Sequence, residues 1–387
     1  MSGPSSRRRL LMVIGKLGRA GAENQLVALA SGLAERGDRV TVADLTRGVP
    51  NVGPLHESGV KLLQFDSSAG VRRAAVLPSL ARVARRHDLV HCTMWDASLW
   101  GRLAGIAAGR PVIVSDHSAD RSHQISHSGA PRRRLIALHN RVLEPATYAT
   151  VACAYAQVPL LHSEGVRRVV HIPNGVSLEA LGEATASGTS REQLGIPEEA
   201  RTIIHVARFH PLKNQRLTLK TTARLRAELG DVHVIFVGDG DERPALEHQA
   251  RATGAHWAHF LGHRTDVARL LGLSELAVLP SLSEAMPMAI VEAMAVGVPV
   301  VATAVGDIGL TLDSTGAGLH VPPGDSDAFF EACRRVLTDS TLRDGLASRA
   351  LLSAQNFTVE AMIDRYSELF DAMIERRPPE TLPAVAR

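Results

Sequence analysis

The chain has 387 residues, 45% of them hydrophobic, which is enough for two domains that each bury a core of their own. The net charge is only +3, and the three cysteines are too few and too widely spaced to predict a disulfide framework or a zinc cage. No apolar run approaches the length of a membrane span, so composition argues against a transmembrane protein and against a small disulfide-stapled one.

Charge is unevenly distributed along the chain. Residues 1–185 carry 23 Lys and Arg against 14 Asp and Glu, whereas the remainder carries 20 against 26. The basic half is expected to face an anionic membrane surface, a lipid diphosphate or simply solvent. Nucleic acid is not expected, because no recognised module or aromatic stacking platform accompanies the charge.

The first half alternates predicted strands with predicted helices. The apolar run 10–14 follows basic residues as in a signal peptide, but it is short and Lys16 interrupts it, so we expect a buried strand. This alternation predicts a doubly wound parallel sheet with right-handed crossovers. The expected strands are 10–14, 40–43, 60–65, 88–92, 111–115 and 151–154, and the expected helices are 22–36, 76–86, 97–108 and 156–164.

Two loops of this half carry candidate functional residues. Gly18 and Gly21 let the backbone approach a ligand at a helix start, although a plain tight turn explains them equally well. Their three-residue spacing does not match a dinucleotide fingerprint. His117 follows a strand end, where side chains project from the sheet; a solvated histidine is the simpler alternative. His123 and His127 lack the ordered spacing of metal ligands.

Residues 131–141 combine a basic cluster with a helical apolar pattern. A solvated helix face is one interpretation. The functional alternative is a patch that contacts a membrane surface or a lipid acceptor, since basic amphipathic helices adsorb to anionic headgroups.

The second half repeats the alternation after a polar, glycine-bearing segment at 177–199. Arg208 and Lys213 follow its first strand, and such a pair of cations suits a diphosphate, although surface charges are an equal alternative on spacing alone. We interpret Asp239-x-Asp241 as turn chemistry and not as a metal site. The expected strands are 202–206, 232–237, 259–261, 276–279, one ending at residue 303, and 318–321; helices are expected from about 266 and at 328–337, 342–354 and 359–376.

Residues 281–303 are expected to form a loop, a helix of roughly ten residues, a turn and a strand. Pro287 is placed at the first helical position and Gly297 at the end, with Pro299 preventing continuation. Glu284 and Glu292 bracket a helix N-terminus that suits a phosphate or another anion. On their spacing alone, two glutamates at these positions would be interpreted as solvent-exposed side chains.

This stretch closely resembles the Glu-x7-Glu signature of the family 4 retaining glycosyltransferases, which have the two-domain GT-B fold. The resemblance implies that Glu284 contacts the donor sugar and Glu292 the nucleotide ribose. Backbone amides after Glu284, near Met286 to Ala289, would meet the sugar or its phosphate, and the donor sugar would be bound at Met286, Pro287 and Met288.

Other motifs appear in the family's order from about residue 10 to 375 and carry further implied roles. Arg208 and Lys213 resemble the pair that binds the donor diphosphate, and Gly18 and Gly21 resemble the glycine loop that faces the donor phosphate. His117 resembles the strand-end histidine beside the transferred sugar. The residues 172–176, Ile-Pro-Asn-Gly-Val, match the phrase that closes the family's first domain.

Two positions depart from the family pattern. Thr93 stands where relatives commonly have a second histidine after His91, and Ala285 stands where glycine is frequent. If the loop at Ala285 needed a positive φ, alanine would strain it.

The expected architecture is α/β, with two Rossmann-like doubly wound parallel-sheet domains facing across a cleft. The expected divisions are an acceptor-side domain at 1–176, a linker at 177–199, a nucleotide-sugar domain at 200–355, a C-terminal helix at 356–377 that crosses back to the first domain, and a tail at 378–387.

The expected activity is retaining transfer of a sugar from a nucleotide diphosphate donor, UDP first and GDP next, to a hydroxyl acceptor such as a lipid-linked saccharide or a natural product. His117 and Glu284 are the expected catalytic residues, with no metal and no cofactor beyond the nucleotide sugar. The expected location is the cytoplasm, with peripheral contact at the inner membrane face as an extension. A nucleotide-sugar epimerase of the same fold and a non-catalytic nucleotide-sugar binder remain alternatives.

Overall fold

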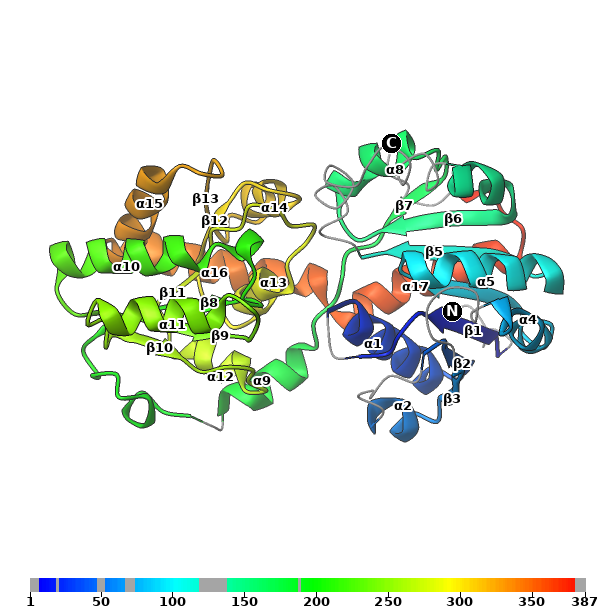
Figure 1. Ribbon diagram of the computed structural model, residues 1–387, viewed down its shortest axis with the longest axis horizontal. Helices are drawn as coiled ribbons and strands as arrows, with labels where there is room; N and C mark the ends of the chain where they lie inside the picture. The colour runs from blue at the N-terminus through cyan, green and yellow to red at the C-terminus, as the bar shows by residue number, and fades with distance from the viewer. Residues whose placement is uncertain are drawn as a thin grey trace. The chain divides into compact units, whose positions relative to one another are not determined.

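The computed structural model describes residues 7–18, 21–46, 53–66, 74–117, 138–186 and 189–379. The chain divides into two compact units, the first made of Met1–Gly175 with Val359–Arg387 and the second of Val176–Thr358. Each unit is built on one parallel sheet with helices on both faces (Figure 1). The predicted doubly wound α/β fold is therefore confirmed in both units.

The first unit contains a seven-stranded sheet of order β3-β2-β1-β4-β5-β6-β7 in which every pair is parallel. The strand order reverses direction between β1 and β4, and open α/β sheets bind ligands beyond the carboxyl ends of strands at such a switch point. The strands are β1 (Arg9–Ile14), β2 (Arg39–Asp44), β3 (Lys61–Gln64), β4 (Leu89–Thr93), β5 (Val112–Asp116), β6 (Thr147–Ala152) and β7 (Val169–His171).

Helices cover both faces of this sheet because alternate strand residues point to opposite sides. Leu10, Met12 and Ile14 of β1 pack in one cluster with α1 and α17, whereas Leu11 and Val13 pack in another with α4 and α5. The helices are α1 (Gly21–Glu35), α2 (Gly53–Glu57), α4 (Leu77–Ala84), α5 (Trp95–Ala108), α8 (Val158–Ser163) and α17 (Val359–Ile374).

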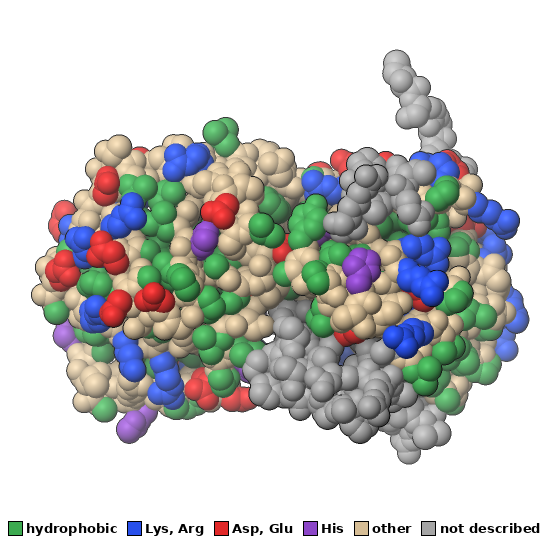
Figure 2. Space-filling view, turned by 90° about the horizontal axis from the view of Figure 1, so that it is seen from above, with side chains coloured by type: hydrophobic (Ala, Val, Ile, Leu, Met, Phe, Trp, Pro, Cys, Tyr) green, Lys and Arg blue, Asp and Glu red, His purple; other side chains and the backbone are tan. Residues whose placement is uncertain are grey.

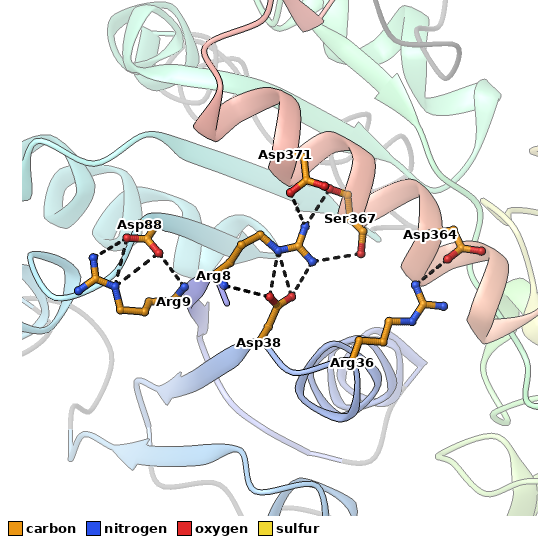
Figure 3. A network of polar contacts seen from close by, with 8 residues as sticks. All are labelled: Arg8, Arg9, Arg36, Asp38, Asp88, Asp364, Ser367 and Asp371. Carbon is orange, nitrogen blue, oxygen red and sulfur yellow. Dashed lines mark hydrogen bonds and ion pairs between the residues drawn. The ribbon is translucent and has the colours of Figure 1, made fainter. Parts of the chain in front are cut away.

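Helix α17 belongs to the first unit, although it follows the whole second unit in sequence. Its apolar stripe, which includes Tyr366 and Phe370, is buried in the same core as α1. A polar network fixes the opposite side (Figure 3). The buried Arg8 guanidinium donates to Asp38 at 2.6 Å and to Asp371 of α17 at 3.0 Å, and Arg36 pairs with Asp364 at 2.6 Å.

The second unit contains a six-stranded parallel sheet of order β10-β9-β8-β11-β12-β13, with its switch point between β8 and β11. The strands are β8 (Arg201–Val206), β9 (Val232–Val237), β10 (Ala258–Phe260), β11 (Leu276–Leu279), β12 (Val300–Thr303) and β13 (Gly318–Val321). The helices are α9 (Leu178–Ala186), α10 (Gln215–Leu229), α11 (Arg243–Ala252), α12 (Val267–Gly272), α13 (Met288–Ala295), α14 (Ile308–Thr315), α15 (Ser326–Thr338) and α16 (Ser340–Ala354).

The segment 177–199, for which composition predicts a linker, contains α9 and a 3-10 turn at Glu192–Leu194 within the second unit. Leu178 and Leu194 pack against the core on one face of the second sheet. Arg191 fastens the segment further by donating to the carbonyls of Ala200 at 2.9 Å and Leu273 at 2.9 Å. A few apolar and basic residues thus suffice to pack a segment of otherwise polar composition.

Charged side chains of the second unit are intermingled on the surface seen in Figure 2. Several form ion pairs, such as Arg224 with Asp327 at 2.7 Å and Arg334 with Glu331 at 2.7 Å. Residues 131–137 of the predicted basic segment 131–141, like His123 and His127, lie outside the described residues. Within the described residues, no helix combines the length and the apolar character that crossing a membrane requires.

Candidate functional site

The loop after β8 carries the two predicted diphosphate-binding cations. Lys213 ends a 3-10 turn at Pro211–Lys213, and Asn214 then adopts a left-handed conformation, φ 52°, before α10 begins. Arg208 is exposed, and its guanidinium forms no hydrogen bond or ion pair with the described residues. Gln215 donates to the Arg208 carbonyl at 2.9 Å. The local backbone therefore fixes the loop while leaving the Arg208 head group available to a ligand.

The glycines after β9 are required by the close approach of this loop. A Cβ at Gly238, φ 131°, would lie 2.1 Å from the Ala207 carbonyl oxygen, and one at Gly240, φ 150°, would lie 2.2 Å from that of Phe209. Phe209 N–H donates to the Asp239 carbonyl at 2.9 Å. The turn containing Asp239 thus holds the loop that carries Arg208.

Glu284 lies in the loop after β11, on the other side of the switch point from Lys213. Its Oε1 accepts hydrogen bonds from Lys213 Nζ at 2.6 Å and from Ser281 Oγ at 2.7 Å. The Glu284 side chain is only 3% exposed, against 23% for Lys213. Because a buried carboxylate is costly unless it is paired, Lys213 and Ser281 explain how Glu284 is tolerated here.

Helix α13 starts directly after this loop, and the N-terminus of a helix favours an anionic ligand. It spans Met288–Ala295, with Pro287 as the N-cap residue and Gly297 left-handed at φ 71°. The prediction that Pro287 occupies the first helical position was wrong by one residue, because its ψ of 124° is extended. Met286 is buried, and Pro287 and Met288 are half-buried at the helix start.

Ala285 is not strained in this loop, since it is absent from the described residues with positive φ. Alanine in place of the family's frequent glycine therefore causes no backbone strain at this position. The glycine that the loop does require is Gly306, φ 58°, whose added Cβ would lie 2.3 Å from the Glu284 carbonyl oxygen and 2.5 Å from that of Ala285. Asp307 N–H donates to the Ala285 carbonyl at 2.9 Å, which closes this contact.

We expect Gly306→Ala to displace the Glu284 loop and to lower both melting temperature and activity, because backbone atoms must move to admit the new Cβ. Gly309→Ala, in α14, is the matched control. Its Cβ would meet nothing closer than Ala304 Cβ at 3.5 Å, so it should be neutral or slightly stabilising. Equal melting temperatures and activities for the two variants would contradict this role of Gly306.

Glu292 lies in α13 and is half-buried. Burial raises the pKa of its carboxyl, and its side chain has no ionic partner among the described residues. A carboxylate of this kind gains from accepting hydrogen bonds from a ligand, which suits the hydroxyls of a ribose.

His117, immediately after β5 in the first unit, is half-buried. Its Nδ1 lies 3.1 Å from Oδ1 of Asn174, a residue that is itself buried. Burial lowers the pKa of His117 to about 4, although the Asn174 hydrogen bond opposes that shift. The imidazole is therefore neutral near pH 7.

Gly18 and Gly21 flank residues 19 and 20, which lie outside the described residues. Neither glycine has a positive φ, and a Cβ at Gly21 would meet no atom of the described residues within 4 Å. Among the described residues, a Cβ at Gly18 would approach Glu23 alone, with Oε1 at 3.7 Å. The described backbone does not itself require glycine at these positions, so their proposed role depends on the ligand.

His91 and Thr93 are core residues, since both are 1% exposed. His91 Nε2 hydrogen-bonds Ser115 Oγ, which lies 2.8 Å from the Tyr366 hydroxyl of α17. Burial lowers the pKa of His91 to about 3. The departure at Thr93 thus falls inside the sheet and away from solvent.

Acidic residues that resemble metal ligands have local structural roles. Asp239 Oδ1 accepts from the Gly240 N–H at 2.8 Å, and Asp325 caps α15 through the Ala328 N–H at 2.9 Å. Among the described residues, no group of three or more His, Cys, Asp or Glu side chains could hold a metal ion.

The predicted site residues divide between the units. Gly18, Gly21 and His117 lie in the first, and the remainder lie in the second. Sequence reasoning missed three residues that position them: Ser281, Asn174 and Gly306. The sheet topology explains the grouping, because the loops after β8 and β11 meet at one switch point.

Comparison with known proteins identifies the family. Residues 19–180 match the family described as Glycosyltransferase Family 4, and residues 200–339 match that described as Glycosyl transferases group 1. A D-inositol 3-phosphate glycosyltransferase of Geodermatophilus obscurus is 30% identical over 95% of this chain and 88% of its own length. The chain belongs to the family 4 glycosyltransferases.

The glycosyltransferase also resembles more distant proteins. A phosphatidyl-myo-inositol mannosyltransferase of Mycolicibacterium smegmatis is 27% identical over 85% of this chain and 84% of its own. The solved structure of Anabaena HepE with UDP-glucose superimposes with a TM-score of 0.80 at 22% identity, covering 95% of this chain and 100% of that one. At such identity the likeness shows the fold, and the predicted GT-B class is confirmed.

Proposed function

We propose that this glycosyltransferase moves a sugar, with retention of configuration, from a nucleotide diphosphate donor to a hydroxyl acceptor. The observation that carries the proposal is the bond between Lys213 and the buried Glu284, next to the N-terminus of α13 and at the switch point of the second sheet. A buried carboxylate, a lysine and a helix N-terminus offer a polyhydroxylated, anionic ligand both acceptors and donors.

Each side chain has a distinct part in donor binding under this proposal. Arg208 and Lys213 hold the diphosphate together with the N-terminus of α13, and Gly18 and Gly21 leave room for the phosphates. The donor sugar lies against Met286, Pro287 and Met288. Glu284 accepts hydrogen bonds from sugar hydroxyls, and Glu292 accepts them from the ribose. His117 hydrogen-bonds the transferred sugar.

The proposed chemistry needs no metal. The acceptor oxygen forms its bond to the anomeric carbon on the same face from which the phosphate oxygen departs. The departing phosphate oxygen takes the acceptor's proton, so the products are the glycoside and the nucleoside diphosphate. Lys213, Arg208 and the α13 N–H groups stabilise the charge that develops on the leaving group.

UDP is the favoured nucleotide, with GDP next. Support comes from the relatives' names, which include an Escherichia coli galactosyltransferase acting from UDP-Gal, and from the HepE structures with UDP and UDP-glucose. The acceptors in those names define the panel to test: D-inositol 3-phosphate, phosphatidyl-myo-inositol and GlcNAc-diphosphoundecaprenol.

The first test is thermal unfolding of the protein with UDP-, GDP-, ADP- and TDP-sugars, with and without EDTA. A ligand that binds only the folded state must raise the melting temperature. At a hundredfold excess over Kd, we expect one nucleotide to add about 2.7 kcal/mol to the free energy of unfolding and so to raise the melting temperature. EDTA should not reduce this shift. No shift with any donor at millimolar concentration would contradict the proposed donor site.

Release of nucleoside diphosphate then decides the reaction type. Release that depends on an acceptor from the panel supports glycosyl transfer. Conversion of the donor sugar without any acceptor would show an epimerase, and binding without turnover across the panel would show a non-catalytic binder.

A further inference from the structure

The segment that leads out of the first unit crosses the carboxyl edge of its sheet. It leaves the edge strand β7 at His171 and reaches Asn174 and Gly175, the last residue of this part of the unit. There it hydrogen-bonds His117, which directly follows β5, and Gln25 of α1. Two elements that follow different strands of the sheet are therefore joined by one short segment.

The Gln25 side chain hydrogen-bonds both the N–H and the carbonyl of Gly175. Its Nε2 donates to the Gly175 carbonyl at 2.9 Å, and its Oε1 accepts from the Gly175 N–H at 2.9 Å. The amide orientation of Gln25 is therefore determined by its partners, since only one assignment satisfies both bonds. Gln25 and Asn174 are 6% and 7% exposed, so this contact is sheltered from water.

The direction of the His117 hydrogen bond follows from its partner. The Oδ1 of Asn174 can only accept, so His117 Nδ1 must carry the hydrogen. A neutral imidazole has one N–H, which leaves Nε2 with a free lone pair. His117 in turn lowers the pKa of His91, which burial already keeps neutral.

We propose that Asn174, held in place by Gln25, is a positioning residue that locks His117 in the Nδ1–H tautomer, so that Nε2 faces the ligand as a hydrogen-bond acceptor. This inference rests on the proposed function only for the identity of the ligand, a sugar hydroxyl. It assigns a role to the Asn174-Gly175 pair, which directly precedes the first residue of the second unit, Val176. Asn174 fixes the tautomer of His117.

The tautomer can be measured without any substrate. Two-bond ¹⁵N–¹H spectra of protein labelled at histidine nitrogen distinguish Nδ1–H from Nε2–H rings, and His117→Gln identifies the His117 signals by their loss. We expect wild-type His117 to show Nδ1–H with an unprotonated Nε2 between pH 6 and 8. An Nε2–H ring, or an even mixture, would overturn the proposal.

Two substitutions at Asn174 separate positioning from folding. Asn174→Ala removes the acceptor, so Nδ1–H should lose its preference and kcat/KM should fall roughly three- to tenfold at every pH. Asn174→Asp keeps an acceptor but adds a negative charge, which raises the pKa of His117 from about 4 toward neutrality. Below the raised pKa, Nε2 carries a hydrogen and cannot accept.

Asn174→Asp should therefore retain activity at high pH and lose it as pH falls. The wild type should show no such decrease in activity between pH 6 and 8, because the pKa of its His117 is about 4. Asn24→Asp is the matched control, because Asn24 is exposed on the same helix as Gln25 and gives the same charge change. Its pH profile should match that of the wild type. A flat profile for Asn174→Asp, or Asn174→Ala with wild-type tautomer and kcat/KM, would contradict the role assigned to Asn174.

Failure of the proposed function would look different. If the wild type transfers no sugar, the spectra still decide whether Asn174 sets the tautomer. If the wild type is active while His117 has the other tautomer, the positioning role alone is lost.

Discussion

Lys213→Met is expected to lower kcat/KM by about 10²- to 10³-fold, because one preorganised donor to the developing leaving-group charge is removed. The substitution also leaves buried Glu284 with Ser281 as its remaining hydrogen-bond donor among the described residues. Losing a hydrogen bond to a charged group costs about 1.5–3 kcal/mol, which would lower the melting temperature by several degrees. Steady-state kinetics and thermal unfolding measure the two effects separately.

The double variant Lys213→Met/Glu284→Gln distinguishes catalysis from stability. Replacing the carboxylate with an amide removes the uncompensated buried charge, so the melting temperature should recover while activity stays low. Lys220→Met is the control for the side-chain change, since Lys220 is exposed on α10. Full activity in Lys213→Met would contradict the role given to this lysine.

Arg8→Met is expected to destabilise the first unit by about 3–5 kcal/mol, because it leaves a buried carboxylate without its partner. Asp38 is 5% exposed and receives three hydrogen bonds from the Arg8 side chain, the shortest at 2.6 Å. The same guanidinium also donates to Asp371 and to the Ser367 carbonyl of α17 (Figure 3). Urea unfolding and limited proteolysis near α17 would report the loss.

The adjacent Arg9 gives the control for this prediction. It pairs with Asp88 at 2.6 Å, but its side chain is 48% exposed, so Arg9→Met should change stability little. Arg8→Met/Asp38→Asn should recover part of the loss because no buried charge remains. Equal stability of the Arg8 and Arg9 variants would show that the Arg8 network does not hold α17.

Features with strong local signals could be predicted from the sequence. Buried parallel strands are short apolar runs, as at Leu276–Leu279, and Gly297 marks the end of α13 through its positive φ. The loops with Arg208, Lys213 and Glu284 could be placed at strand ends for the same reason. Their common location follows from doubly wound topology, in which the carboxyl ends of parallel strands share one edge.

Features that depend on distant partners could not be predicted. Nothing local pairs Lys213 with Glu284, which are 71 positions apart. Asn174 was only part of a recognised phrase, because its role depends on His117 in another strand's loop. Helix α14 was missed since Gly309, two threonines and one serine weaken its helical signal, whereas burial of Ile308 and Leu312 stabilises it.

The position of α17 has a consequence for how the protein acquires its structure. On the ribosome, every residue of the second unit is synthesised before α17, so the second unit can complete its core first. The first unit must wait with the apolar side of α1 uncovered, since Ile363, Tyr366 and Phe370 belong to the same core. Closing so long a chain segment slows folding and exposes apolar surface meanwhile. The first unit is therefore the half expected to need chaperone protection during synthesis.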